Sequence, residues 1–150
     1  MAHTRVPSLL TPMVDLGTVL IVEDDDGIRS LLVAVVERDG FRSKVAEDGD
    51  GALEALGDGA AEPVVILLDL IMPRVDGFTV LGHLEKNSPH LLQRVIVLTA
   101  ASEPRLRSAD ELKRVWCVRR KPLEIDDLSA QMRSCAEAAR DGGQRAAYSG

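Results

Sequence analysis

Side chains that could hold a metal ion or a phosphoryl group follow four short apolar segments of this chain. They are Glu23, Asp24, Asp25, Asp69, Thr99 and Lys121. Two unit charges about 4 Å apart interact by about 4 kcal/mol at an effective dielectric near 20, so carboxylates gathered from such segments need a cation. Oxygen ligands select a hard ion, and a site with few carboxylates and room for water suits Mg²⁺. These residue types therefore predict a Mg²⁺ site.

Asp69 is the candidate with the most specific chemistry. It ends an apolar run, where a lone carboxylate would be costly unless it were paired or bound to metal. An aspartate can attack phosphorus to form an acyl phosphate, and this reaction needs neutralisation of the phosphoryl oxygens more than it needs a base. Mg²⁺, the Lys121 ammonium group and the Thr99 hydroxyl would each face one such oxygen. Each acid taken singly could equally be a helix cap or a solvated loop residue, but the set predicts phosphoryl transfer.

The elements that would position these residues form a regular alternation. Short β-branched runs alternate with segments of helical periodicity, five of each, which is typical of βα units around a parallel sheet. The expected strands are residues 18–23, 41–46, 64–68, 94–98 and 115–119. The third has no polar residue, which suits a central strand buried on both faces. In such sheets ligand sites form at the carboxyl ends of the strands, where the candidate residues lie.

Capping residues and apolar stripes mark the expected helices. Asp48, Asp76 and Ser102 are candidate N-caps, and Gly40 closes the first helix. The first helix is expected to bury Ile28, Leu31, Leu32, Val35 and Val36. The fourth helix, within residues 102–112, has only a thin apolar stripe.

Two sequence motifs, together with two later dipeptides, form an ordered set. Residues 19–25 read VLIVEDD, and residues 68–73 read LDLIMP with Asp-Gly at 76–77. Thr99-Ala100 and Lys121-Pro122 complete the set, which resembles the receiver domain family of response regulators over roughly residues 18–139. An acidic pair alone would be weak evidence, but D-x-x-M-P-x-x-D-G is specific. The resemblance implies an α/β fold, namely a flavodoxin-like (βα)5 doubly wound parallel sheet with strand order 2-1-3-4-5.

The resemblance also implies a role for each residue of the site. Asp69 would be the phosphoacceptor, and Asp24 and Asp69 would ligate Mg²⁺ directly. Glu23 would act mainly through a bound water, and Ile71 would contribute its backbone carbonyl. Asp25 lies outside the matched acidic pair and is assigned to the start of the first helix.

The fifth strand departs from the family pattern. In the family the Lys-Pro bond is commonly cis, which for Lys121-Pro122 would direct the amine at the acyl phosphate; cis is accessible at X-Pro bonds. In the family, phosphorylation draws the Thr hydroxyl inward, and an aromatic residue on strand five follows it. In this chain the Thr position is Thr99, and the position of the aromatic residue is Val118. Trp116, two residues earlier, should project from the same side of the strand and take over part of this reporting role, the alternative being a packing tryptophan. Arg119 stands where the family usually has an apolar residue.

These features predict a phosphorylation-activated switch of a two-component system. It would not be an enzyme but would accept a phosphoryl group from a sensor histidine kinase or a phosphotransfer protein. It would then signal to an unknown downstream protein through the face of helix four, strand five and helix five, with a homodimer through this face left open. We expect a stand-alone receiver at residues 18–139, with a flexible extension at residues 1–17 and a flexible tail at residues 140–150.

The composition indicates which partners and which cellular compartment to expect. The net charge of −6 argues against direct nucleic-acid binding, which usually needs a basic patch. Cys117 and Cys135 are too few for a disulfide framework, which favours a reducing compartment and hence the cytoplasm. No apolar run approaches the roughly 20 residues that span a bilayer, so no membrane insertion is expected.

Three alternatives stay open on the sequence. A degenerate receiver would act as a protein-interaction module without phosphorylation, which Val118 keeps plausible. A phosphohydrolase with an aspartate nucleophile would want a second acid two residues after Asp69, where Ile71 stands. A flavodoxin-like nucleotide binder would want a Gly-rich loop after the first strand, where residues 23–26 are all acidic.

Overall fold

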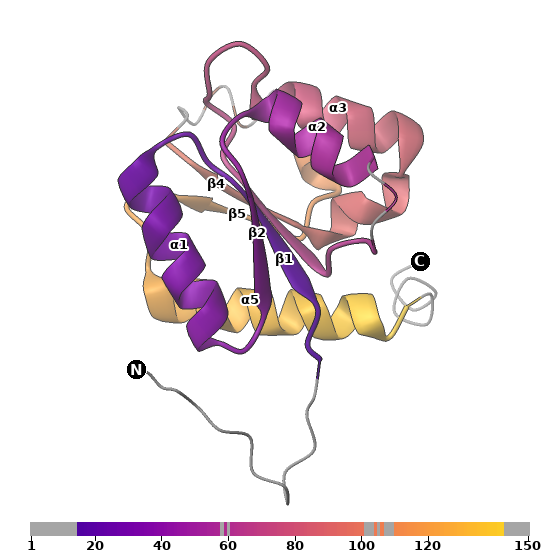
Figure 1. Cartoon of the computed structure of the whole chain (residues 1–150). Helices are drawn as coiled ribbons and strands as arrows, with labels where there is room; N and C mark the ends of the chain where they lie inside the picture. Colours follow the sequence, from indigo (N-terminus) through magenta and orange to yellow (C-terminus); the bar gives the residue numbers. More distant parts are fainter. Residues whose placement is uncertain are drawn as a thin grey trace, which may run out of the picture.

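The computed structural model of the chain describes residues 15–57, 59, 61–100, 104, 106 and 110–142. Its centre is one parallel five-stranded sheet with strand order β2-β1-β3-β4-β5 (Figure 1). The strands are β1 (Thr18–Val22), β2 (Arg42–Ala46), β3 (Val65–Leu68), β4 (Val95–Thr99) and β5 (Cys117–Arg120). This is the α/β architecture and the strand order predicted from the sequence.

Helices cover both faces of the sheet. Figure 1 shows α1 and α5 on one side of the sheet and α2 and α3 on the other. Their bounds are α1 (Asp26–Arg38), α2 (Gly49–Gly57), α3 (Gly77–Asn87) and α5 (Ile125–Arg140), and two short 3-10 helices are η1 (Pro89–Arg94) and η2 (Asp110–Lys113). Among the described residues, no helix is long and apolar enough to cross a membrane.

The core lies on both sides of the central strands. All four residues of β3 are buried, as expected for an apolar run in the middle of a parallel sheet. Alternate residues of β1, β3 and β4 point to opposite faces, so they contribute to two apolar clusters, one under α1 and α5 and one under α2 and α3. The sheet is therefore a rigid base for the loops at its carboxyl edge.

Aspartate caps begin the helices next to that edge. Asp25 is the N-cap of α1 and accepts a hydrogen bond from the Ile28 N–H at 2.8 Å, as its assignment to the helix start predicts. Asp76 caps α3 through the Thr79 N–H at 3.0 Å. Asp48 accepts from the Gly51 N–H at 2.8 Å at the start of α2. Each cap fixes the direction in which the chain leaves a strand.

Several local expectations are corrected by the structure. β1 ends at Val22, β2 begins at Arg42 and β3 begins at Val65, each one residue inside the expected strand. Residue 94 belongs to η1, because the segment after Ser88 first forms a 3-10 turn, and β4 begins at Val95. Leu31 is 46% exposed, because one residue along a helix turns a side chain by about 100° and Leu32 faces the sheet instead. β5 begins at Cys117 rather than at residue 115, because residues 114–116 form a bend. Most of the expected fourth helix, including Ser102, lies outside the described residues.

Candidate functional site

Three carboxylates gather at the carboxyl edge of the sheet. Glu23 and Asp24 follow β1, Asp69 follows β3, and one oxygen of each lies within 4.8 Å of the others. Glu23 is 1% exposed and Asp69 is 4% exposed, whereas Asp24 faces solvent. The site thus has two buried acids and one acid at its mouth, which leaves an ion reachable from water.

Lys121 is the positive charge of this cluster. It follows β5, and its backbone N–H donates to the Thr99 carbonyl at 3.0 Å. Its Nζ donates to Glu23 Oε1 at 2.9 Å and to Asp69 Oδ2 at 3.2 Å. The Lys121-Pro122 peptide bond is cis, as the resemblance implies.

The electrostatics show an excess of negative charge. Burial raises the pKa of Glu23 above its ordinary value, and the neighbouring Asp69 charge adds to this, while hydrogen bonds from Lys121 and the Asp25 N–H oppose it. Burial alone would lower the pKa of Lys121, but the hydrogen bond to Glu23 and the charges of Asp69 and Glu23 outweigh it, so this pKa is raised. The pKa of Lys121 is raised because one ammonium group faces several carboxylates, whereas the pKa of Glu23 is raised chiefly because its carboxyl group is buried.

The donor set suits a hard divalent ion. Three carboxylates and one ammonium group leave two negative charges to be balanced, and every candidate metal ligand of the cluster is a carboxylate oxygen. Mg²⁺ prefers oxygen ligands and usually keeps several waters, which the exposed position of Asp24 permits. The residues present therefore fit Mg²⁺.

Backbone N–H groups stabilise the loop after Asp69. The Ile71 N–H donates to Asp69 Oδ1 at 3.0 Å, and the Gly77 N–H donates to the Leu70 carbonyl at 3.0 Å. A Cβ on Gly77 would lie 2.4 Å from the Asp69 carbonyl oxygen, so only glycine permits this approach. The same contact packs the start of α3 against the backbone of Asp69 and Leu70.

Thr99 and Val118 share one face of the sheet. Thr99 is fully buried at the end of β4, two residues after Val97, which pairs with Val118 of β5. Val97 belongs to the cluster under α2 and α3, and Val118 packs against that same cluster. Because side chains alternate along a strand, Thr99 points to this face as well.

Trp116 does not share that face, which corrects the expectation from alternation. It lies in the bend before β5 and packs against the cluster under α1 and α5, and its backbone N–H donates to the Val95 carbonyl at 2.8 Å. The indole Nε1–H donates to Gln131 Oε1 of α5 at 3.0 Å. The alternation fails because the regular strand starts only at Cys117.

Arg119 is accommodated by an acidic partner on α5. Its Nε donates to Asp127 Oδ2 at 2.6 Å and its guanidinium NH2 group to Asp127 Oδ1 at 3.4 Å. The hydrogen bond to Asp127 raises the pKa of Arg119, and the same bond lowers the pKa of Asp127. The charged side chain at a usually apolar position therefore binds α5 and does not enter the site.

Sequence reasoning missed Arg29. Its guanidinium NH1 group donates to the Glu23 carbonyl at 3.0 Å and to the Asp24 carbonyl at 3.4 Å. In the sequence, Asp26 and Arg29 have the spacing of an ordinary ion pair within a helix, and such pairs usually lie on a solvated face. Nothing in that pattern indicates contact with the acidic loop.

Comparison with known proteins identifies the family. The sequence model of the response regulator receiver domain matches residues 19–133. The chain belongs to this family. Receiver domains of response regulators are signalling switches of two-component systems, and the acidic cluster is compatible with Mg²⁺ and phosphorylation.

Curated relatives of this receiver domain are regulatory proteins. The probable methanogenesis regulatory protein FilR2 of Methanothrix harundinacea is 32% identical over 130 residues, which cover 79% of this chain and 81% of FilR2. The regulatory protein AtoC of Escherichia coli is 32% identical over 119 residues, or 78% of this chain and 24% of AtoC. The response regulator MprA of Mycobacterium sp. is 30% identical, with 77% of this chain and 49% of MprA covered. The receiver chain thus spans only part of the last two proteins.

Solved receiver structures share the fold. A CheY-like response regulator receiver protein of Methanospirillum hungatei has a TM-score of 0.71 and 27% identity over 84% of this chain and 98% of that chain. TrrA of Thermotoga maritima, solved in complex with Mg²⁺ and BeF, has a TM-score of 0.69 and 27% identity over 79% of this chain and 98% of TrrA.

Proposed function

We propose that this receiver domain accepts a phosphoryl group on Asp69 from a phosphohistidine of a sensor kinase or phosphotransfer protein. A carboxylate oxygen of Asp69 forms the new P–O bond, and the P–N bond breaks with its electron pair going to the imidazole. The observation that carries this proposal is the convergence of Glu23, Asp24, Asp69 and Lys121 at one sheet edge. The complex of TrrA with Mg²⁺ and BeF supports it, since that relative is similar in fold.

Each residue of the site has a proposed part in the reaction. Asp24 and Asp69 would ligate Mg²⁺ directly, Glu23 would hold it through water, and Ile71 would offer its backbone carbonyl. Bound there, Mg²⁺ would supply positive charge to the phosphoryl oxygens. Lys121, already directed at Asp69, would neutralise another oxygen, and the Thr99 hydroxyl would bind the third.

Asp69→Asn is expected to abolish phosphoryl incorporation. Incubation with a small phosphodonor and Mg²⁺, followed by intact-protein mass measurement, should show one phosphoryl adduct on the wild-type protein and none on Asp69→Asn. Asp50→Asn, an exposed acid in the first turn of α2, is the matched control and should behave like wild type. A wild-type protein that stays unmodified with Mg²⁺ and donor would favour the degenerate receiver that works without phosphate.

The signal would leave the site by two routes. Val118 lies on the Thr99 face, so movement of the Thr99 hydroxyl would act on Val118 and the cluster under α2 and α3. Trp116 lies on the other face and contacts α5 through Gln131, so it would report on α5. We keep both as reporters, with Val118 next to the switch and Trp116 remote from it.

Tryptophan fluorescence tests the second route. Trp116 is the only tryptophan of the chain, so the emission spectrum reports this residue alone. Addition of Mg²⁺ with beryllofluoride is expected to shift its emission, because a displaced α5 would change the hydrogen bond to Gln131. Asp69→Asn should show no shift. An unchanged wild-type spectrum would mean that Trp116 is a packing residue only.

The partners and the extent of the domain belong to the same proposal. We place the receiver domain at residues 18–139 and in the cytoplasm. It would signal by protein contact through the face that includes β5 and α5, where a homodimer could also form, and it would neither bind nucleic acid directly nor insert into a membrane.

A further inference from the structure

We propose that Arg29 is a positioning residue, which sets the two acids after β1 in the geometry that binds Mg²⁺. This inference rests on the proposed metal site and adds a residue outside it. Arg29 lies in the first turns of α1, and only 16% of its side chain is exposed. Such a partly buried arginine side chain is unusual on a helix surface, and its N–H groups need partners.

The partners of Arg29 are the backbone of the metal-binding acids themselves. One guanidinium nitrogen donates to the carbonyls of both Glu23 and Asp24, at 3.0 and 3.4 Å. These two residues lie just beyond the last residue of β1; the Glu23 N–H still donates to the Ala46 carbonyl of β2 at 3.1 Å, and Arg29 binds the carbonyls on the other side of these peptide units. Holding their carbonyls fixes the directions in which the Glu23 and Asp24 side chains leave the chain.

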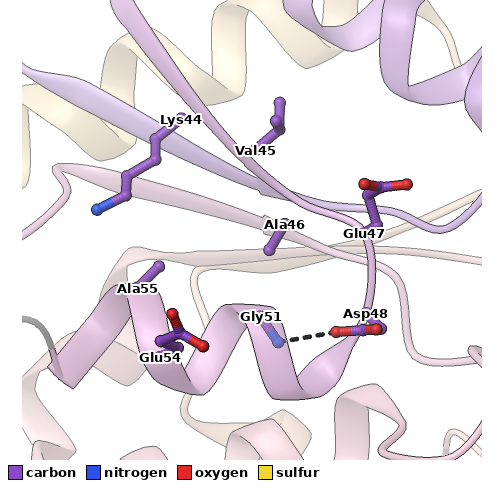
Figure 2. A pocket seen from close by; sticks show the side chains of 8 residues that line it. All are labelled: Lys44, Val45, Ala46, Glu47, Asp48, Gly51, Glu54 and Ala55. Atoms are coloured by element: carbon purple, nitrogen blue, oxygen red, sulfur yellow. Dashed lines mark hydrogen bonds between the residues drawn. The ribbon is translucent and has the colours of Figure 1, made fainter.

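The other guanidinium nitrogen pairs with two acids, one in the same helix and one in a neighbouring loop. It forms ion pairs with Asp26 of α1 and with Glu47 Oε1, the latter at 3.6 Å. Figure 2 shows Glu47 and Asp48 together on the loop that leads from β2 into α2, where Asp48 caps the helix through Gly51. Arg29 therefore connects the acidic loop to a neighbouring loop that is itself held in place.

That neighbouring loop also reaches the phosphoacceptor loop. Asp48 Oδ2 accepts from the Arg74 guanidinium at 2.9 Å. A Cβ on Gly49 would lie 2.2 Å from the Val75 carbonyl oxygen, so the start of α2 packs directly against the chain after Asp69. Through the Arg29–Glu47 ion pair, Arg29 connects the acids after β1 to a loop that packs against the chain after Asp69.

Positioning and simple electrostatics predict opposite signs for the loss of Arg29. A cation beside the acids repels Mg²⁺, so removing its charge would by itself tighten Mg²⁺ binding. Removing a residue that orients metal ligands weakens binding, typically 10-fold or more. Arg29→Lys keeps the charge but has no planar fork to span two carbonyls and a carboxylate. The two variants together separate the two effects.

The test is Mg²⁺ titration of the unphosphorylated full chain by calorimetry, with the melting temperature measured in Mg²⁺-free buffer. Arg29→Gln is expected to raise the Mg²⁺ dissociation constant about 10-fold, and Arg29→Lys to raise it by a smaller factor. With a phosphodonor, both variants should need more Mg²⁺ for half-maximal rate but regain the wild-type rate at saturating Mg²⁺. A purely structural role of Arg29 would not raise the Mg²⁺ requirement while leaving the rate at saturating Mg²⁺ unchanged.

Arg42→Gln is the matched control. Arg42 begins β2 at the opposite end of the strands, where it pairs with Asp15 at 2.9 Å in an exposed ion pair. Its loss should leave Mg²⁺ affinity unchanged. Unchanged or tighter Mg²⁺ binding by Arg29→Gln, or wild-type affinity of Arg29→Lys, would overturn the proposal. Because calorimetry measures Mg²⁺ alone, a protein that binds Mg²⁺ but accepts no phosphoryl group would refute the proposed function and still test Arg29.

Discussion

Replacement of Lys121 by methionine is expected to lower the free energy of unfolding by about 3 kcal/mol in Mg²⁺-free buffer at neutral pH. Lys121 is the ammonium partner of Glu23 and Asp69, both of which are buried. Methionine fills a similar volume but leaves two carboxylates facing each other in a poorly hydrated site. Urea denaturation measures the loss. Lys86→Met, on the exposed side of α3, should change stability by less than about 0.5 kcal/mol.

Mg²⁺ and pH should both modify this loss. A ligand at about 100 times its Kd adds about 2.7 kcal/mol to the folded state, so Mg²⁺ should restore much of the stability of Lys121→Met. Because burial raises the pKa of Glu23 above 4.5, its contribution to stability is present below the unfolded pKa and is lost as pH rises through the folded pKa. Without Lys121 the hydrogen bond and charge that oppose this rise are lost, so the pKa of Glu23 is raised further in the variant, and the gap in stability between variant and wild type should narrow on acidification. A constant gap from acidic to neutral pH would contradict this explanation.

Replacement of Gly77 by alanine is expected to destabilise the fold by about 3 kcal/mol and to slow phosphoryl incorporation about 100-fold. A Cβ there would meet the Asp69 carbonyl oxygen at 2.4 Å and Leu70 Cα at 2.6 Å. Both neighbours are backbone, so α3 must move away or the acceptor loop must shift with Asp69. Denaturation and the rate of modification by a small phosphodonor measure the two effects.

Gly82 offers a control within the same helix. A Cβ at Gly82 meets nothing within 4 Å, so Gly82→Ala should stabilise the protein by about 0.8 kcal/mol through helix propensity and leave phosphorylation unchanged. If Gly77→Ala were as stable and as active as Gly82→Ala, the close approach of α3 to Asp69 would not be needed for the site.

The fold and the convergence of the site were predictable because their signals are local in the sequence. The unbroken apolar run before Asp69 marks a strand buried on both faces, and only a central parallel strand needs one. Parallel strands then bring Glu23, Asp69 and Lys121 to one edge, although they lie far apart in the chain. Asp76 was recognisable as a cap because it directly precedes an apolar stripe, and Asp25 was assigned to the helix start because it lies outside the matched acidic pair.

Two kinds of feature could not be predicted from the sequence: the contacts of long side chains, and the residue at which a regular strand begins. Side chains alternate between the faces of a regular strand, but a bend delays β5 to Cys117 and puts Trp116 on the other face from Val118. The long side chain of Arg29 bends back from α1 to the carbonyls of the acidic loop, and no periodicity describes such a contact. The Arg119 pair with Asp127 likewise depends on how β5 and α5 pack.

The most direct test of the central claim is to locate the phosphoryl group. Borohydride reduces the acyl phosphate of an aspartate to homoserine, which tandem mass spectrometry places at a single position. After treatment with a phosphodonor and Mg²⁺, homoserine is expected at residue 69 and nowhere else, and it should vanish when a chelator removes Mg²⁺. Reduction at Asp24 or at any other acid, or no reduced residue in a wild-type protein that has bound Mg²⁺, would contradict the assignment of Asp69 as the phosphoacceptor.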